Sequence, residues 1–92
     1  MIKLAVKVHS PQEVILTATG WITATNVTDL EREMQRWRGQ TQRLILELAD
    51  IRAIDENGLK LLRCWSSPPL ELRGNSAFLQ ALLATEGLEL NA

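Results

Sequence analysis

The 92-residue chain is predicted to fold as a single small α/β domain, residues 1–92, whose mixed and mostly parallel β-sheet has helices packed on it. Two observations predict this fold class. Strand-like and helix-like segments follow one another in the order β-β-α-β-α-β-α, and one strand segment is almost continuously apolar. Strands alternating with helices require right-handed crossovers between parallel strands, and the first strand then adds on antiparallel.

The first two strands are predicted from side-chain alternation. Residues 2–8 alternate apolar side chains with Lys3 and Lys7, which is the period of a half-buried strand. Pro11 suits the second position of a turn. Residues 14–22 are β-branched and apolar, so we expect a second strand that pairs with the first as a hairpin.

A first helix is predicted within residues 23–40. Thr25 or Asn26 can cap its start, and Gly39 is placed to end it. Its apolar residues recur at three- and four-residue spacings, which puts them on one stripe of the helix. The stripe consists of Val27, Leu30, Met34 and Trp37.

The centre of the chain is predicted to be a strand followed by a helix. Residues 43–48 are apolar nearly throughout, as in a central parallel strand that is covered on both faces. Residues 56–65 are predicted to be helical and to stop before residues 66–69, which include two prolines.

The last third adds a short alternating strand, residues 70–74, and a helix within residues 75–87 that Asn75 or Ser76 can cap and Gly87 can stop. Residues 88–92 are too short to assign, and an edge strand and a loose end both fit. The apolar face of the helix is predicted to be Phe78, Leu79, Leu82 and Leu83.

Composition narrows the function classes. The formal net charge is -1, which gives no electrostatic footprint for nucleic acid or an anionic membrane surface. A single cysteine cannot form an internal disulfide, and the opening residues do not resemble a signal peptide. The apolar runs fall short of the ~20 residues that a membrane span needs, so we expect a soluble cytoplasmic domain without membrane insertion.

The sequence shows no arrangement of residues that is typical of a catalytic site. His9 is the only histidine, no metal-ligand spacing occurs, and the glycines are isolated rather than grouped in a phosphate loop. Cys64, among leucines and a tryptophan, is predicted to be a buried structural thiol. We therefore predict no enzyme, no catalytic residue, no cofactor and no metal.

The three tryptophans have different predicted roles. Trp37 is expected in the core, and Trp65 is expected to pack where its helix meets the prolines. Trp21 follows Gly20 at the end of a strand, and two readings stay open: it covers the core, or it is exposed at a contact surface as an interface anchor.

The turn "IDENGL" between the third strand and its helix is explained locally by its residue types. Asp55 is a good N-cap, and Glu56 places a negative charge near the positive end of the helix dipole. Gly58 lets another backbone come close or relieves the first turn.

The segments "LTATGWIT", "LELADIRAIDENGL" and "LRGNSAFLQALLATEGL", in this order, resemble the STAS domain family, the fold of anti-sigma-factor antagonists. The resemblance covers nearly the whole chain. It implies a non-enzymatic protein-interaction domain that takes part in partner switching, signalling and transcription regulation.

In the family, a partner kinase phosphorylates a Ser or Thr that directly follows the turn's Asp. Here the family's Asp, Gly and Leu are kept as Asp55, Gly58 and Leu59, but Glu56 stands at the acceptor position. Glutamate has no hydroxyl, so the resemblance implies a chain that is not switched by phosphorylation there. Glu56 either imitates the phosphorylated state permanently or simply abolishes the switch.

Further departures from the family pattern point to constitutive docking. Trp21 and Thr23 stand where relatives often carry acidic residues, the second helix is short, and a final helix is absent. The predicted partner is another protein, either anti-sigma or serine-kinase-like or a subunit of a transport or chemotaxis-type assembly. Alternatives are a nucleotide- or lipid-sensing module, and a homodimer through the edge strand. The predicted partner-binding residues are Asp55, Glu56, Asn57, Gly58, Lys60, Arg63, Trp21 and Thr23.

Overall fold

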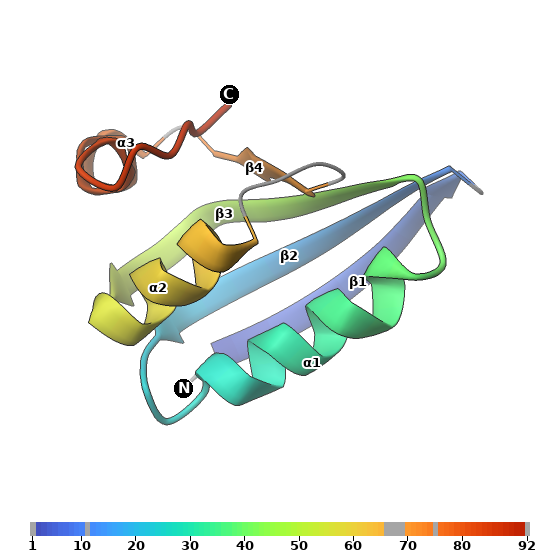
Figure 1. Cartoon of the computed structure of the whole chain (residues 1–92), viewed down its shortest axis with the longest axis horizontal. Coiled ribbons are helices and arrows are strands. Elements are labelled where there is room, and N and C mark those ends of the chain that lie inside the picture. Colours follow the sequence, from blue (N-terminus) through green and yellow to red (C-terminus); the bar gives the residue numbers. More distant parts are fainter. Residues whose placement is uncertain (1, 11, 66–69, 75, 92) are drawn as a thin grey trace.

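The computed structural model describes residues 2–10, 12–65, 70–74 and 76–91 and confirms the predicted order of elements (Figure 1). Pro11, residues 66–69 and Asn75, for which turns or a cap were predicted, lie outside the described residues. The elements are β1 (Ile2–Ser10), β2 (Glu13–Ile22), α1 (Val27–Arg38), β3 (Arg43–Ile54), α2 (Glu56–Cys64), β4 (Leu70–Arg73) and α3 (Ala77–Ala84).

The four strands form one mixed sheet in the order β1-β2-β3-β4. β1 is antiparallel to β2, while β2, β3 and β4 are parallel to one another, as the sequence predicts. The C-terminal segment reaches the β4 edge: the Asn91 N–H donates to the Leu72 carbonyl at 2.9 Å, and the Gly74 N–H donates to the Asn91 carbonyl at 2.6 Å. The segment that the sequence left unassigned therefore makes one strand-like bridge, between Arg73 and Asn91.

The core lies on one face of the sheet, where α1 and α2 pack (Figure 1). Two successive right-handed crossovers in the same direction along the sheet put both helices on the same side. The fully buried side chains of this core include Leu16 and Ala18 from β2, Leu44, Leu46 and Leu48 from β3, Leu30 and Met34 from α1, Leu62 from α2, and Leu79 and Leu83 from α3.

The opposite face of β3 is also covered at Ile45, as the apolar run of residues 43–48 predicts. Ile45 is 0% exposed, yet it points away from its neighbours Leu44 and Leu46 and is outside the core cluster. Its register partners, Ile15 on β2 and Glu71 on β4, are half-buried beside it. Among the described residues, α1 and α2 pack on the other face, and side chains of the adjacent strands help to cover this one.

An ion-pair network runs across the same face. The Arg43 guanidinium pairs with Glu71 and, at 3.2 Å, with Glu13, while Arg73 pairs with Glu71 at 3.2 Å. The hydrogen bond from Arg43 lowers the pKa of the Glu71 carboxyl below its usual value. These groups join β2, β3 and β4, but their partial exposure keeps the contribution of each pair to stability small.

Two core predictions are wrong. Cys64 is exposed, and so is Phe78, whose exposed fraction is 55%. Both lie about 100° of helical rotation or more from the middle of the buried stripe of their own helix. The prediction for Trp65 is confirmed, because this side chain is buried, while Trp37 packs against the core at its margin and is only half-buried.

Candidate functional site

The turn that enters α2 consists of a single residue, Asp55, whose carboxylate joins two parts of the chain. Oδ1 accepts the N–H of Gly58 at 3.0 Å, which confirms the predicted N-cap. Oδ2 accepts the N–H of Ala24 at 3.0 Å, in the loop between β2 and α1. The Asp55 N–H in turn donates to the Ile22 carbonyl at 3.0 Å. The residue is thus a clip that fastens the start of α2 to the end of β2 and to the loop after it.

These hydrogen bonds favour the ionised carboxylate. The hydrogen bond from Gly58 lowers the pKa of Asp55 most, desolvation opposes it, and the hydrogen bond from Ala24 lowers the pKa further. Because the pKa is depressed in the folded state, the stabilisation is fully present above the ordinary carboxyl pKa of ~4. It is lost as the pH falls below that value and through the folded-state pKa.

We expect Asp55→Asn to reduce the acid sensitivity of folding. An amide keeps one acceptor oxygen, so it can accept from Gly58 or from Ala24 but not from both, and it does not titrate. The variant should have a lower Tm than the parent at neutral pH, and the difference should shrink below pH ~4. Circular dichroism melts across this pH range measure it, and a Tm difference that is constant with pH would contradict the assignment.

Gly58 provides the close contact that the sequence suggested. An ideal Cβ on this residue would lie 2.6 Å from Cγ1 of Ile54, 2.7 Å from Cγ2 of Ile22 and 3.0 Å from the Ile22 carbonyl oxygen. The first turn of α2 is therefore pressed against the ends of β2 and β3, and Gly58 is buried there.

The loop between β2 and α1 is ordered by Asn26, which the sequence suggested only as a helix cap. Asn26 is 6% exposed; its Oδ1 accepts the Thr23 N–H at 2.8 Å, and its Nδ2 donates to the Trp21 carbonyl at 2.7 Å. It makes no side-chain cap bond to α1. The signal available in the sequence was an Asn three residues after Thr23, a spacing at which an Asn side chain can bond back to the backbone of a turn.

The exposed side of α2 brings together half of the predicted partner-binding residues. We call this set the α2 surface, and its members are Glu56, Asn57, Lys60 and Arg63, all exposed. Arg63 pairs in addition with Glu86 at 2.7 Å, which ties α2 to the segment after α3.

The other four predicted residues are placed differently. Asp55 and Gly58 are engaged in holding the turn, and Thr23 is half-buried in the loop, where its hydroxyl lies 2.9 Å from that of Thr25. Trp21 is 44% exposed, so it does not simply cover the core, and its role as an interface anchor stays a prediction. It precedes the fully buried Ile22 on β2 and therefore points to the opposite face of the sheet from α2.

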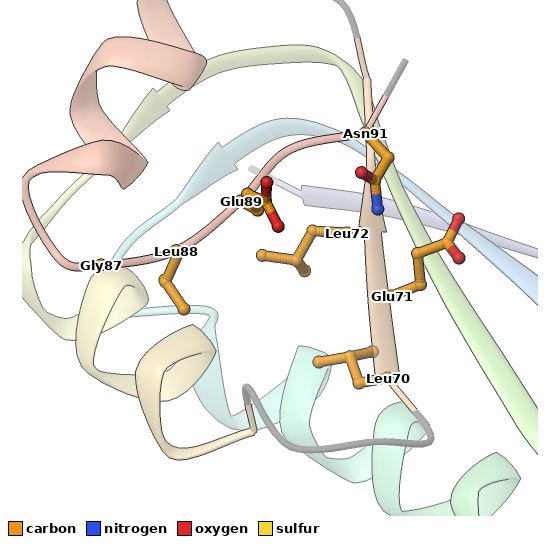
Figure 2. A pocket seen from close by; sticks show the side chains of 7 residues that line it. All are labelled: Leu70, Glu71, Leu72, Gly87, Leu88, Glu89 and Asn91. Carbon is orange, nitrogen blue, oxygen red and sulfur yellow. The ribbon is translucent and has the colours of Figure 1, made fainter.

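A cavity of about 420 Å³ lies at another place, between β4 and the C-terminal segment (Figure 2). It shares no residue with the α2 surface. In the described part of the chain, no group of three or more His, Cys, Asp or Glu side chains could hold a metal ion, and no helix is long and apolar enough to cross a membrane. The side chain of His9 lies outside what the structure describes. The cavity lining is Leu70, Glu71, Leu72, Gly87, Leu88, Glu89 and Asn91.

Comparison with solved structures identifies the fold. SpoIIAA, an anti-sigma factor antagonist, in its unphosphorylated form is similar with a TM-score of 0.76 at 13% identity, over 94% of this chain and 82% of that one. The Bacillus cell fate determinant SpoIIAA in its phosphorylated form has a TM-score of 0.67 at 14% identity, over 94% and 85%. A Shewanella loihica protein with a SpoIIAA-like fold has a TM-score of 0.61 at 7% identity, over 98% and 83%.

Sequence comparison gives a narrower match than the resemblance suggested. Comparison with curated proteins finds no match. The model of the STAS domain matches residues 4–64, which run from β1 to the end of α2 and include the Asp55 turn and Glu56. The match ends before β4 and α3, where only the structural likeness extends. Since the matched segment is more than half of the chain, the chain belongs to the STAS domain family.

Proposed function

We propose that this chain is a regulatory, non-enzymatic domain that binds a partner protein through the α2 surface, and that Glu56 gives this surface a permanent negative charge. The observation that carries the proposal is the place of Glu56. It is the exposed first residue of α2, directly after Asp55 and inside the segment matched by the family model.

The family resemblance supports the choice of surface. The similar SpoIIAA structures are of an unphosphorylated and a phosphorylated form, so charge is changed on that relative. The resemblance implies that relatives carry the modified hydroxyl after the turn's Asp, where this chain has Glu56. A carboxylate carries about one negative charge, whereas a phosphoserine carries about -1.5 to -2. The proposed partner is an anti-sigma or serine-kinase-like protein, or a subunit of a larger assembly, that accepts the constant charge.

Anion sensing at the same place is less well supported. A helix start binds phosphate through its free N–H groups. Here the Asp55 carboxylate already accepts the Gly58 N–H, and Glu56 adds a second negative charge beside it. A nucleotide phosphate would therefore meet both a capped helix end and electrostatic repulsion, so we favour a protein partner.

Charge reversal tests the proposal. Once the partner has been captured with the tagged chain and purified, we expect Glu56→Lys to weaken its binding by about tenfold or more, because like charges across an interface are strongly unfavourable. Isothermal titration calorimetry measures the change. Glu89→Lys makes the same charge change at an exposed position on the C-terminal segment and should leave the affinity unaltered. Equal affinities for the parent and Glu56→Lys would remove the α2 surface from the interface.

A second substitution tests whether only the hydroxyl was lost. If the partner is a serine kinase, Glu56→Ser should accept phosphate from ATP, seen as a mass increase of the intact chain, while Glu56→Ala should not. Binding of the phosphorylated variant should then match that of the parent more closely than binding of the unmodified variant does. The reverse order would show that Glu56 does not imitate the phosphorylated state.

A further inference from the structure

β1 is an edge strand whose core-side face is incompletely covered. α1 packs against β2 and β3. The register pairs Leu4 with Ala18 and Val6 with Leu16. Ala18 and Leu16 are 0% exposed, whereas Leu4 is half-buried and Val6 is 39% exposed. The apolar side of the sheet therefore extends one strand further than α1 covers.

A groove of about 510 Å³ follows from this offset between β1 and α1. Leu4 and Val6 line it from the strand and Trp37 lines it from the helix. The indole ring is held in place: its Nε1–H donates to Oε2 of Glu33 at 3.2 Å, and the Arg36 guanidinium lies 5.3 Å from the ring centre. The strand wall of the groove is thus apolar, and the helix wall combines the fixed Trp37 ring with four charged side chains, those of Asp29, Arg32, Glu33 and Arg36.

The charges of the groove itself are balanced, because Arg32 and Arg36 line it together with Asp29 and Glu33; unbalanced positive charge lies on the other face of β1. At its α1 rim, Arg32 and Arg36 have side chains that are 74% and 63% exposed, with only long ion pairs of 3.6 and 3.7 Å to acidic neighbours on the same helix. On the other face of β1, Lys3 and Lys7 are exposed, and neither takes part in an ion pair among the described residues. The two lysines alternate with the apolar residues, so one face of the β1 edge is apolar and the other is positively charged.

The backbone of β1 adds a third element of recognition. It is a strand of 9 residues that, within the described part of the chain, has a neighbouring strand on one side only, since β1 is first in the sheet order. Alternate residues of an edge strand turn their N–H and C=O groups outward, where they can pair with an added strand. A free strand edge beside a helix, with a groove between them, is a geometry that suits an extended peptide.

We propose that the β1 edge and the groove beside α1 bind an extended segment of another protein as an added β-strand. Alternate apolar side chains of this segment enter the groove between Val6 and Trp37, and the intervening acidic side chains face Lys3 and Lys7. A second copy of β1 fits less well, because it brings its own two lysines to the same face, and like charges on adjacent strands are destabilising. This surface is separate from the α2 surface and does not depend on the function proposed for it.

Two synthetic peptides test the proposal, with the sequences Glu-Val-Glu-Val-Glu-Val-Glu and Lys-Val-Lys-Val-Lys-Val-Lys. Each is titrated into the ¹⁵N-labelled full chain and followed by NMR. We expect the acidic peptide to shift the amide resonances of β1 and of the rim of α1, and to bind about tenfold more tightly than the basic one. The double variant Lys3→Glu/Lys7→Glu should reverse this preference. Arg52→Glu reverses one positive charge on an exposed residue of β3, away from the proposed edge, and should leave the preference as it was.

Five outcomes would overturn the proposal. Three of them are equal or stronger binding of the basic peptide, shifts confined to the α2 surface, and unchanged binding of the acidic peptide to a Val6→Asp variant whose fold circular dichroism has first verified. The fourth is a shift of the groove resonances with decanoate while neither peptide produces one, which would identify a lipid site. Movement of β1 resonances with protein concentration alone would assign the edge to a second copy of the chain instead.

Discussion

Gly58→Ala is expected to destabilise the protein by about 2 kcal/mol, although alanine normally favours a helix over glycine by about 1 kcal/mol. The added methyl would lie 2.6 and 2.7 Å from the side chains of Ile54 and Ile22 and 3.0 Å from a backbone oxygen. Ile22 is 0% exposed, so its side chain can move only by disturbing the core, and the oxygen belongs to the Ile22 carbonyl that accepts the Asp55 N–H. In a domain of this size, the loss corresponds to a fall in Tm of roughly 8–16 °C.

Gly39→Ala is the matched control for this substitution. Gly39 ends α1 with φ −77°, which any residue adopts, and nothing lies within 4 Å of its Cβ position. We expect it to leave the Tm unchanged or to raise it slightly, because alanine lowers the entropy of the unfolded chain. Thermal melts of both variants measure the two Tm changes. Equal Tm values for Gly58→Ala and the parent would show that α2 does not approach β2 as closely as described.

Leu83→Ala should cost about 2–5 kcal/mol of the free energy of unfolding. Leu83 is 0% exposed and belongs to the same core cluster as Leu72 of β4 and Leu62 of α2. Truncating it leaves a cavity between α3 and the sheet. The substitution therefore tests whether α3, which lies beyond the segment matched by the family model, is an integral part of the core. Urea unfolding measures the free energy.

Phe78→Ala on the same helix distinguishes the orientation of α3 in the structure from the orientation that the sequence predicts. The sequence predicts Phe78 on the buried face, which would make its truncation as costly as that of Leu83. The structure exposes 55% of Phe78, so we expect a change within about 0.5 kcal/mol. If both variants were equally destabilised, the sequence-based prediction would be right, and α3 would be rotated relative to the sheet from the orientation described.

The order of elements was predictable because the periods of the strands and helices are distinct in this chain. β1 alternates lysine with apolar residues, and α1 spaces Leu30 and Met34 four residues apart between charged side chains. Each pattern allows only one face to be buried. The Asp55 cap was predictable for a similar reason, because a cap bonds to a residue only three positions away.

The errors arose where the local pattern was ambiguous or the cause was distant. α3 is apolar almost all round, so its composition does not reveal that Leu79 and Leu83 are buried while Phe78 is not. For Cys64, the spacing of Leu61 and Trp65 could have predicted its exposure, since both of these residues lie on the buried side of the helix and Cys64 does not. The bond from Ala24 to Asp55 joins residues 31 positions apart, and no local rule predicts such a contact.

The clip formed by Asp55 has a consequence for the thermodynamics of recognition. With Ala24 and Gly58 both bound to one carboxylate, the loop after β2 and the first turn of α2 lose their conformational freedom when the chain folds. Little ordering then remains for the moment of association, and the entropic penalty that weakens binding by disordered segments is avoided. The interface that we propose around Glu56 can therefore be small and polar and still hold a partner, because the half-buried turn at Asp55 has already fixed its geometry.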